Sequence, residues 1–168
     1  MPSIDVDGLD FDFPTAWEKS KYDDWAFYRN RFSRMWNGIK SIDLLAVDPG
    51  KTAWFIEVKD YRESIRTKPS ELGDEVARKV FDTLAAMLPA KHNASDAEEI
   101  KIATAVLGAK KLRVVLHLEQ PRKHSTLRPR AIDPVAVQQD LRRLLKSIDA
   151  HAVVVEMNRM GTLAWSVK

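Results

Sequence analysis

The segment from residue 43 to residue 59 constrains the fold of this chain more than any other. Two apolar runs flank the turn sequence Pro49-Gly50-Lys51. Proline fixes φ at about −65°, whereas a two-residue hairpin loop needs a positive φ at its first position. The sequence therefore predicts a hairpin with a three-residue loop, in which Asp48 pairs with Thr52.

This register decides which side chains share a face of the sheet. A three-residue loop sets Asp43 across from Glu57, and Lys59 follows on the same face because side chains alternate along a strand. A two-residue loop would instead set Asp43 opposite Ile56 and put the two carboxylates on opposite faces. A half-exposed strand with a polar, solvated face is the simpler alternative. The apolar residues interspersed on this face favour a partly covered surface, on which two carboxylates and an ammonium group converge.

Two neighbouring carboxylates beside an ammonium group form a suitable site for a hard divalent cation and a phosphate. The pattern Ile42-Asp43, followed fourteen residues later by Glu57-Val58-Lys59 on a hairpin preceded by a helix, resembles the PD-(D/E)xK nuclease superfamily. This superfamily includes many restriction enzymes and Holliday-junction resolvases, and Ile42 stands where its name has proline. The resemblance implies an α/β, restriction-endonuclease-like fold, with a central mixed β-sheet flanked by helices in three layers.

The resemblance also implies an activity, namely metal-dependent hydrolysis of phosphodiester bonds in nucleic acid, with DNA as the expected substrate. Asp43 and Glu57 would hold Mg²⁺ or Mn²⁺, with the backbone carbonyl of Val58 as a further oxygen ligand. Lys59 would orient the attacking water or stabilise charge in the transition state. Burial and a nearby metal are expected to depress the pKa of Lys59.

An acidic residue from the first helical region often completes the metal site in related resolvase-like enzymes. Glu18 is the candidate by its position before Asp43. Asp23 and Asp24 are alternatives, although helix N-capping would explain either one, and Glu75 on a later helix is a weaker option. His117, on a later strand, is expected to be structural.

Length and composition fit one compact domain over residues 1–168, with residues 1–16 as an acidic N-terminal arm. The chain is 45% hydrophobic and 30% charged, enough for a sizeable core. It has no cysteine, which excludes disulfides and thiolate zinc sites. The sequence shows neither a secretory signal pattern nor an apolar run of membrane-spanning length, so a cytoplasmic protein is expected.

Basic residues concentrate between positions 109 and 130, a segment that contains seven lysines and arginines and one glutamate. With a pI near 9.1, this segment favours a polyanionic partner, most simply a nucleic-acid backbone. A solvated loop beside a strand is the alternative. The candidate nucleic-acid-binding residues are Lys110, Lys111, Arg113, Arg122, Lys123, Arg128 and Arg130.

Periodicity and capping residues predict the remaining elements. The expected helices span residues 23–37, 70–88 (ended by Pro89), 95–108 (opened by a Ser95–Glu98 capping box) and 133–148, and the expected strands span residues 112–118, 152–157 and 162–167. This order is typical of an α/β domain with a mixed sheet.

Two other functional classes remain open. A non-catalytic nucleic-acid-binding or assembly subunit would keep the fold and use the Asp43, Glu57 and Lys59 cluster structurally. A protein-interaction module, such as an immunity or inhibitor protein, would use the acidic arm as its contact surface. A homodimer is a reasonable expectation, since symmetric dimers are common.

Overall fold

A mixed five-stranded sheet forms the centre of the computed structural model, which describes residues 3–68 and 71–168. In spatial order the strands are β3 (Glu18–Lys21), β4 (Leu44–Val47), β5 (Thr52–Asp60), β6 (Lys111–Glu119) and β7 (Val153–Val155). Strand β4 pairs antiparallel with both β3 and β5, whereas β6 pairs parallel with both β5 and β7. The predicted α/β class with a mixed sheet is confirmed.

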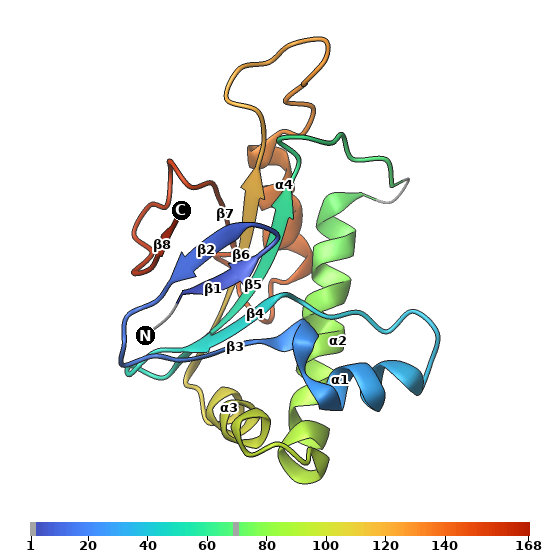
Figure 1. The fold of residues 1–168 in the computed structure, drawn as a ribbon, viewed down its shortest axis with the longest axis vertical. Helices are drawn as coiled ribbons and strands as arrows, with labels where there is room; N and C mark the ends of the chain where they lie inside the picture. Colours follow the sequence, from blue (N-terminus) through green and yellow to red (C-terminus); the bar gives the residue numbers. More distant parts are fainter. Residues whose placement is uncertain (1–2, 69–70) are drawn as a thin grey trace.

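Three helices cover one face of this sheet: α2 (Leu72–Asn93), α3 (Ala97–Leu107) and α4 (Pro134–Leu144) (Figure 1). Their apolar sides join Phe55 and Leu116 from the central strands in the larger core cluster. No helix in the described part of the chain is long and apolar enough to cross a lipid bilayer.

A second, three-stranded sheet covers the opposite face, and this corrects the expectation of an N-terminal arm. It consists of β1 (Ile4–Val6), β2 (Leu9–Asp12) and β8 (Ser166–Val167), in the order β1-β2-β8. Val6, Leu9 and Phe11 alternate with exposed acids and bury their side chains in a second core cluster. The acidic N-terminal segment is therefore a folded hairpin with a charged outer face.

The hairpin of β4 and β5 has the predicted register. Leu44 pairs with Ile56 and Val47 pairs with Ala53. The backbone N–H of Asp48 donates to the carbonyl of Thr52 at 3.0 Å, which closes the three-residue loop. Lys51 takes the positive φ of 61° that such loops require at their last position.

The first predicted helix is wrong as a continuous element. Residues 22–34 form a 3₁₀ turn η1 (Tyr22–Asp24), the short helix α1 (Ala26–Asn30) and a second 3₁₀ turn η2 (Phe32–Arg34). Trp25 is extended, with ψ of 132°, and the carboxylate of Glu99 on α3 accepts hydrogen bonds from the N–H groups of Ala26 and Phe27. A partner 73 residues away thus starts α1, and no local sequence pattern could show it.

The later elements differ from their predicted bounds mainly at the ends. Helix α2 continues through Pro89 to Asn93, and its expected first residue, Ser70, lies outside the described residues. The cap of α3 is Asp96, which accepts from Glu98 and Glu99, and not Ser95. Helix α4 starts at the predicted Asp133–Pro134 cap but ends at Leu144, and β7 and β8 are shorter than expected.

Candidate functional site

Asp43 lies directly before the first residue of β4, and its side chain accepts a backbone hydrogen bond from β5. The N–H of Ile42 is donated to Thr83 Oγ1 on α2 at 3.1 Å, so the chain turns away from β5 there. The carboxylate of Asp43 then accepts the N–H of Val58 at 2.7 Å. This bond holds one carboxylate oxygen at the open edge of β5, beside Glu57.

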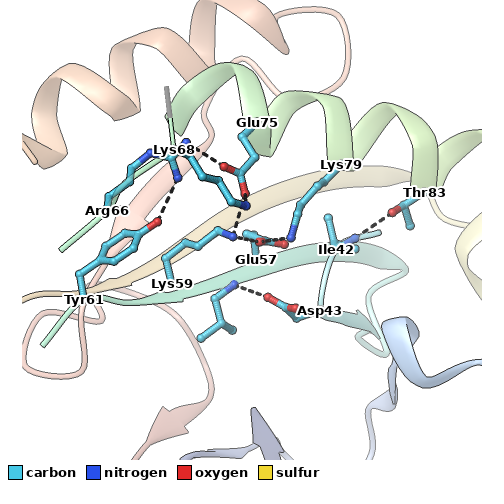
Figure 2. A network of polar contacts seen from close by, with 11 residues as sticks. Ile42, Asp43, Glu57, Lys59, Tyr61, Arg66, Lys68, Glu75, Lys79 and Thr83 are labelled. Carbon is cyan, nitrogen blue, oxygen red and sulfur yellow. Dashed lines mark hydrogen bonds and ion pairs between the residues drawn. The ribbon is translucent and has the colours of Figure 1, made fainter. Parts of the chain in front are cut away.

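Glu57 is buried under α2, with 1% of its surface exposed. Its Oε1 accepts from Lys59 Nζ at 3.1 Å and from Lys79 Nζ at 2.5 Å (Figure 2). Its Oε2 is also buried, yet it has no hydrogen-bond partner among the described residues. A buried carboxylate oxygen without a donor is costly, so Glu57 has unused capacity to bind a positive group.

The two carboxylates disfavour each other's charge. Burial raises the pKa of Glu57 to about 7, and the neighbouring charge of Asp43 adds to this rise. Burial likewise raises the pKa of Asp43, although the Val58 hydrogen bond and the charge of Lys79 oppose the shift. Lys59 and Lys79 therefore do not fully compensate the buried negative charge, and a divalent cation would stabilise it further.

Lys59 links Glu57 to a second carboxylate on α2. Its Nζ lies 2.9 Å from Glu75 Oε1, and Glu75 also binds Arg66 at 2.8 Å and Lys68 at 3.0 Å. Burial acts to lower the pKa of Lys59, but Glu57 and Glu75 outweigh it and hold the pKa above its ordinary value. The expected depression of the Lys59 pKa is thus wrong for the metal-free site, where Lys59 stays an ammonium ion.

Lys79 is the site residue that sequence reasoning missed. Glu75, Lys79 and Thr83 are spaced four residues apart along α2, and all three reach the β4–β5 hairpin (Figure 2). Residues four apart share one helix face. A polar residue at every fourth position along the buried side of a long helix is the signal that would have found Lys79.

Among the acidic candidates of the N-terminal region, Asp23 is electrostatically coupled to Asp43, whereas Glu18 lies at the other end of β4. Glu18 pairs with Val47 at the far end of β4 and binds Lys101 at 2.8 Å. Asp23 has a buried Oδ1 that finds no hydrogen-bond partner in residues 3–68 and 71–168. Burial raises the pKa of Asp23 to about 6, and the charge of Asp43 contributes next. Asp24, the other alternative, forms an ion pair with Arg29.

The donor set suits a hard cation with few protein ligands. Within the described residues, no three His, Cys, Asp or Glu side chains form a metal-binding cluster. Mg²⁺ often binds through only one or two carboxylates and keeps several waters. Asp43 and the unsatisfied Oε2 of Glu57 meet that requirement. The carbonyl of Val58 leaves β5 on the same open edge as its N–H, and its role as a ligand stays a prediction.

The seven candidate nucleic-acid-binding residues form two groups rather than one surface. Lys110, Lys111 and Arg113 lie at the start of β6, where Arg113 binds Asp149 and lies over the ring of Trp54. Arg122, Lys123, Arg128 and Arg130 follow its end. The six residue steps from Arg113 to Glu119 at the end of β6 span roughly 20 Å at about 3.3 Å per residue, so the groups lie at opposite ends of this strand.

The three arginines of the second group border a hollow of about 660 Å³ beyond the ends of β5 and β6, here termed the arginine pocket. Five arginines line it against three glutamates: Arg62, Arg122, Arg128, Arg130 and Arg159, with Glu63, Glu119 and Glu156. Lys59 is at the same end of the sheet, since it pairs with Leu118. The arginine pocket therefore lies nearer the carboxylate site than the Lys110 group does.

Comparison with known proteins gives one informative similarity. A cysteine–tRNA ligase of Neisseria meningitidis serogroup A is 30% identical over 170 aligned residues, which cover 83% of this chain. The aligned region is 24% of that protein, so the chain spans about a quarter of the length of this relative. No family model matches the chain, and no solved structure is significantly similar.

Proposed function

We propose that this chain is a divalent-cation-dependent nuclease that hydrolyses phosphodiester bonds. The observation that carries the proposal is the convergence of Asp43, Glu57 and Lys59, with one Glu57 oxygen that receives no hydrogen bond from the residues that the structure describes. The order of hairpin, helix, parallel strand and helix around this site agrees with the resemblance to PD-(D/E)xK nucleases.

Each residue of the site has a distinct task in this mechanism. Asp43 is oriented by the Val58 N–H, and Glu57 is oriented by two ammonium groups, so both carboxylates are fixed before a ligand arrives. A bound Mg²⁺ or Mn²⁺ would lower the pKa of a water ligand and polarise the phosphoryl group. Lys59 remains protonated, so it stabilises negative charge on the phosphoryl oxygens and does not remove a proton.

The arginine pocket supplies the surface for the nucleic-acid backbone in this proposal. Arginine binds phosphate through two parallel hydrogen bonds. Arg122 forms no ion pair with the described residues, and Arg128 pairs only with the exposed Glu63, so both are available to phosphate. DNA is the expected substrate, and the name of the similar tRNA ligase adds structured RNA as a substrate to test.

The experiment is a cleavage assay on labelled single-stranded, double-stranded and branched DNA and on tRNA, with Mg²⁺, Mn²⁺ or EDTA. Wild type is compared with Glu57→Ala, Lys59→Ala and the control Lys68→Ala, since Lys68 contacts Glu75 but not Glu57. Cleavage that needs a metal, Glu57 and Lys59 but not Lys68 supports the nuclease. Metal-independent cleavage, or cleavage that survives Glu57→Ala, contradicts it.

A non-catalytic nucleic-acid-binding domain is the second candidate. The observation that favours it is the match to a quarter of a tRNA ligase, which fits a module attached to a larger enzyme. In that case the charged residues around Glu57 would serve stability, and the arginine pocket would bind tRNA or another nucleic acid. Binding without cleavage on every substrate, and no Mn²⁺ binding by calorimetry, would favour this function.

A further inference from the structure

The Glu57 carboxylate is closed to solvent by the side chains around it. Glu57 is 1% exposed, and the two ammonium-bearing side chains beside it, Lys59 and Lys79, are 15% and 16% exposed. Asp43 is only partly buried, so a cation approaching from solvent reaches Asp43 first. Both ammonium groups contact Oε1 of Glu57, and Oε2, which has no donor among the described residues, is buried beside them, so a cation that binds Oε2 is repelled by the ammonium groups already present.

The two lysines are not equally anchored. Lys59 binds both Glu57 and Glu75, and Glu75 is held in turn by Arg66 and Lys68. Lys79 binds Glu57 alone among the described residues. Its four-carbon stem projects from the side of α2 that faces the hairpin (Figure 2), and its side chain is 16% exposed, so rotation about its own bonds can withdraw the ammonium toward solvent. Lys79 is therefore the partner that can leave at the lower cost.

Lys79 also lies where its positive charge serves both carboxylates. It makes the shorter contact with Glu57, 2.5 Å against 3.1 Å for Lys59. Its positive charge acts to lower the pKa of both Asp43 and Glu57. A divalent cation shared by Asp43 and Glu57 would serve the same two groups from the same side.

We propose that Lys79 competes with the divalent cation for Glu57 and so sets the concentration at which the metal site fills. In the metal-free protein the ammonium is an internal counter-ion for the buried Glu57 carboxylate and the partly buried Asp43 carboxylate. When the cation binds, like-charge repulsion displaces Lys79 toward solvent, and Lys59 stays in place through Glu75. This inference rests on the proposed metal site and adds to it a residue that weakens metal binding.

The test measures Mn²⁺ binding by calorimetry and the Mn²⁺-induced rise in melting temperature, without any substrate. Lys79→Met removes the charge and keeps most of the stem, Lys79→Arg keeps the charge, and Arg78→Met is the control on the exposed side of α2, where Arg78 pairs with Asp82. We expect Lys79→Met to bind Mn²⁺ about tenfold more tightly, a change of about 1.4 kcal/mol. Lys79→Arg and Arg78→Met should stay within about twofold of wild type.

The outcomes separate this inference from the proposed function. Equal or weaker Mn²⁺ binding by Lys79→Met, in a protein with wild-type circular dichroism, overturns the role of Lys79 and leaves the metal site standing. If wild type and all three variants bind no Mn²⁺ at millimolar concentration, both the competition and the metal site are overturned. Tighter binding that Glu57→Gln abolishes in the Lys79→Met background supports both.

Discussion

Strands β5 and β6 carry two buried polar groups on opposite faces, and the two are balanced differently. On the helical face, one carboxylate oxygen of Glu57 has no donor in the described part of the chain, and burial raises the pKa of Glu57 to about 7. On the other face, Glu119 accepts from His117 Nε2 at 2.9 Å and from the Met157 N–H at 2.6 Å. Burial acts to raise the pKa of Glu119, but these bonds hold it below its ordinary value.

This difference separates a candidate site from a structural pair. A lowered pKa shows that the fold stabilises the charged form of a carboxylate. A raised pKa shows that the fold disfavours the charged form, which an additional positive group would stabilise. His117 is fully buried and packs against Phe11, as expected for a structural residue. The unsatisfied charge therefore lies on the helical face, together with Asp43 and Lys59.

The largest expected effect is on the cleavage rate, which should depend on the helical face of the sheet and not on the opposite face. Lys59→Ala should lower cleavage by about 10²-fold to 10³-fold, because a charge that stabilises the phosphoryl oxygens is lost. His117→Phe, on the opposite face, should leave kcat within about threefold in protein that remains folded. Steady-state rates with Mg²⁺, after folding is checked by circular dichroism, measure both. Comparable losses in the two variants would break the functional distinction between the faces.

Binding should also depend on one end of the sheet. Replacing Arg122 and Arg128 together by glutamine should weaken binding of a labelled duplex about tenfold or more at low salt and reduce its salt dependence, since two phosphate contacts are lost. Replacing Lys110 and Lys111 by glutamine, at the far end of β6, removes the same charge and is the matched control. Fluorescence anisotropy across a salt series measures both. Equal losses of affinity in the two double variants would show that both groups of basic residues contact the duplex, which contradicts a binding surface at one end of the sheet.

Neutralising each buried carboxylate should change stability in opposite directions. Glu57→Gln should raise the free energy of unfolding at pH 8 by about 2 kcal/mol, because the variant no longer buries a poorly compensated charge. Glu119→Gln should lower it by about 1 to 3 kcal/mol, because the His117 and Met157 donors lose a charged acceptor. Urea unfolding of the metal-free proteins gives both values, and changes of the same sign would contradict the comparison.

Much of this arrangement could be predicted from local sequence. Pro49 excludes the shorter loop, so the register that brings Asp43 to Glu57 follows from a single residue. Long-range partners decide the rest. Glu99 starts α1 from 73 residues away, and the strand register puts Glu18 beside Val47 instead of Asp43. Lys79 was missed because a lysine on an amphipathic helix ordinarily faces solvent.

The smallest predicted effect concerns Asp23, a further carboxylate whose pKa is raised by burial and by the charge of Asp43. Its folded-state pKa of about 6 lies above the ordinary value of 3.8, so its contribution to stability is complete below pH 3.8 and is lost as the pH rises through 6. Asp23→Asn should therefore stabilise the metal-free protein at pH 8 by about 1 kcal/mol, after solvent screening of this half-buried group is allowed for. Little stabilisation should remain at pH 4.

The measurement is a pair of urea unfolding curves at pH 4 and pH 8, with Asp24→Asn as the neighbouring control. Asp24 is paired with Arg29, so its variant should be neutral or slightly destabilised at both pH values. Addition of Mn²⁺ should reduce the advantage of Asp23→Asn at pH 8, since the cation stabilises the carboxylates that the variant relieves. If Asp23→Asn changes the free energy of unfolding equally at both pH values and with or without Mn²⁺, Asp23 does not share the uncompensated negative charge of Asp43 and Glu57.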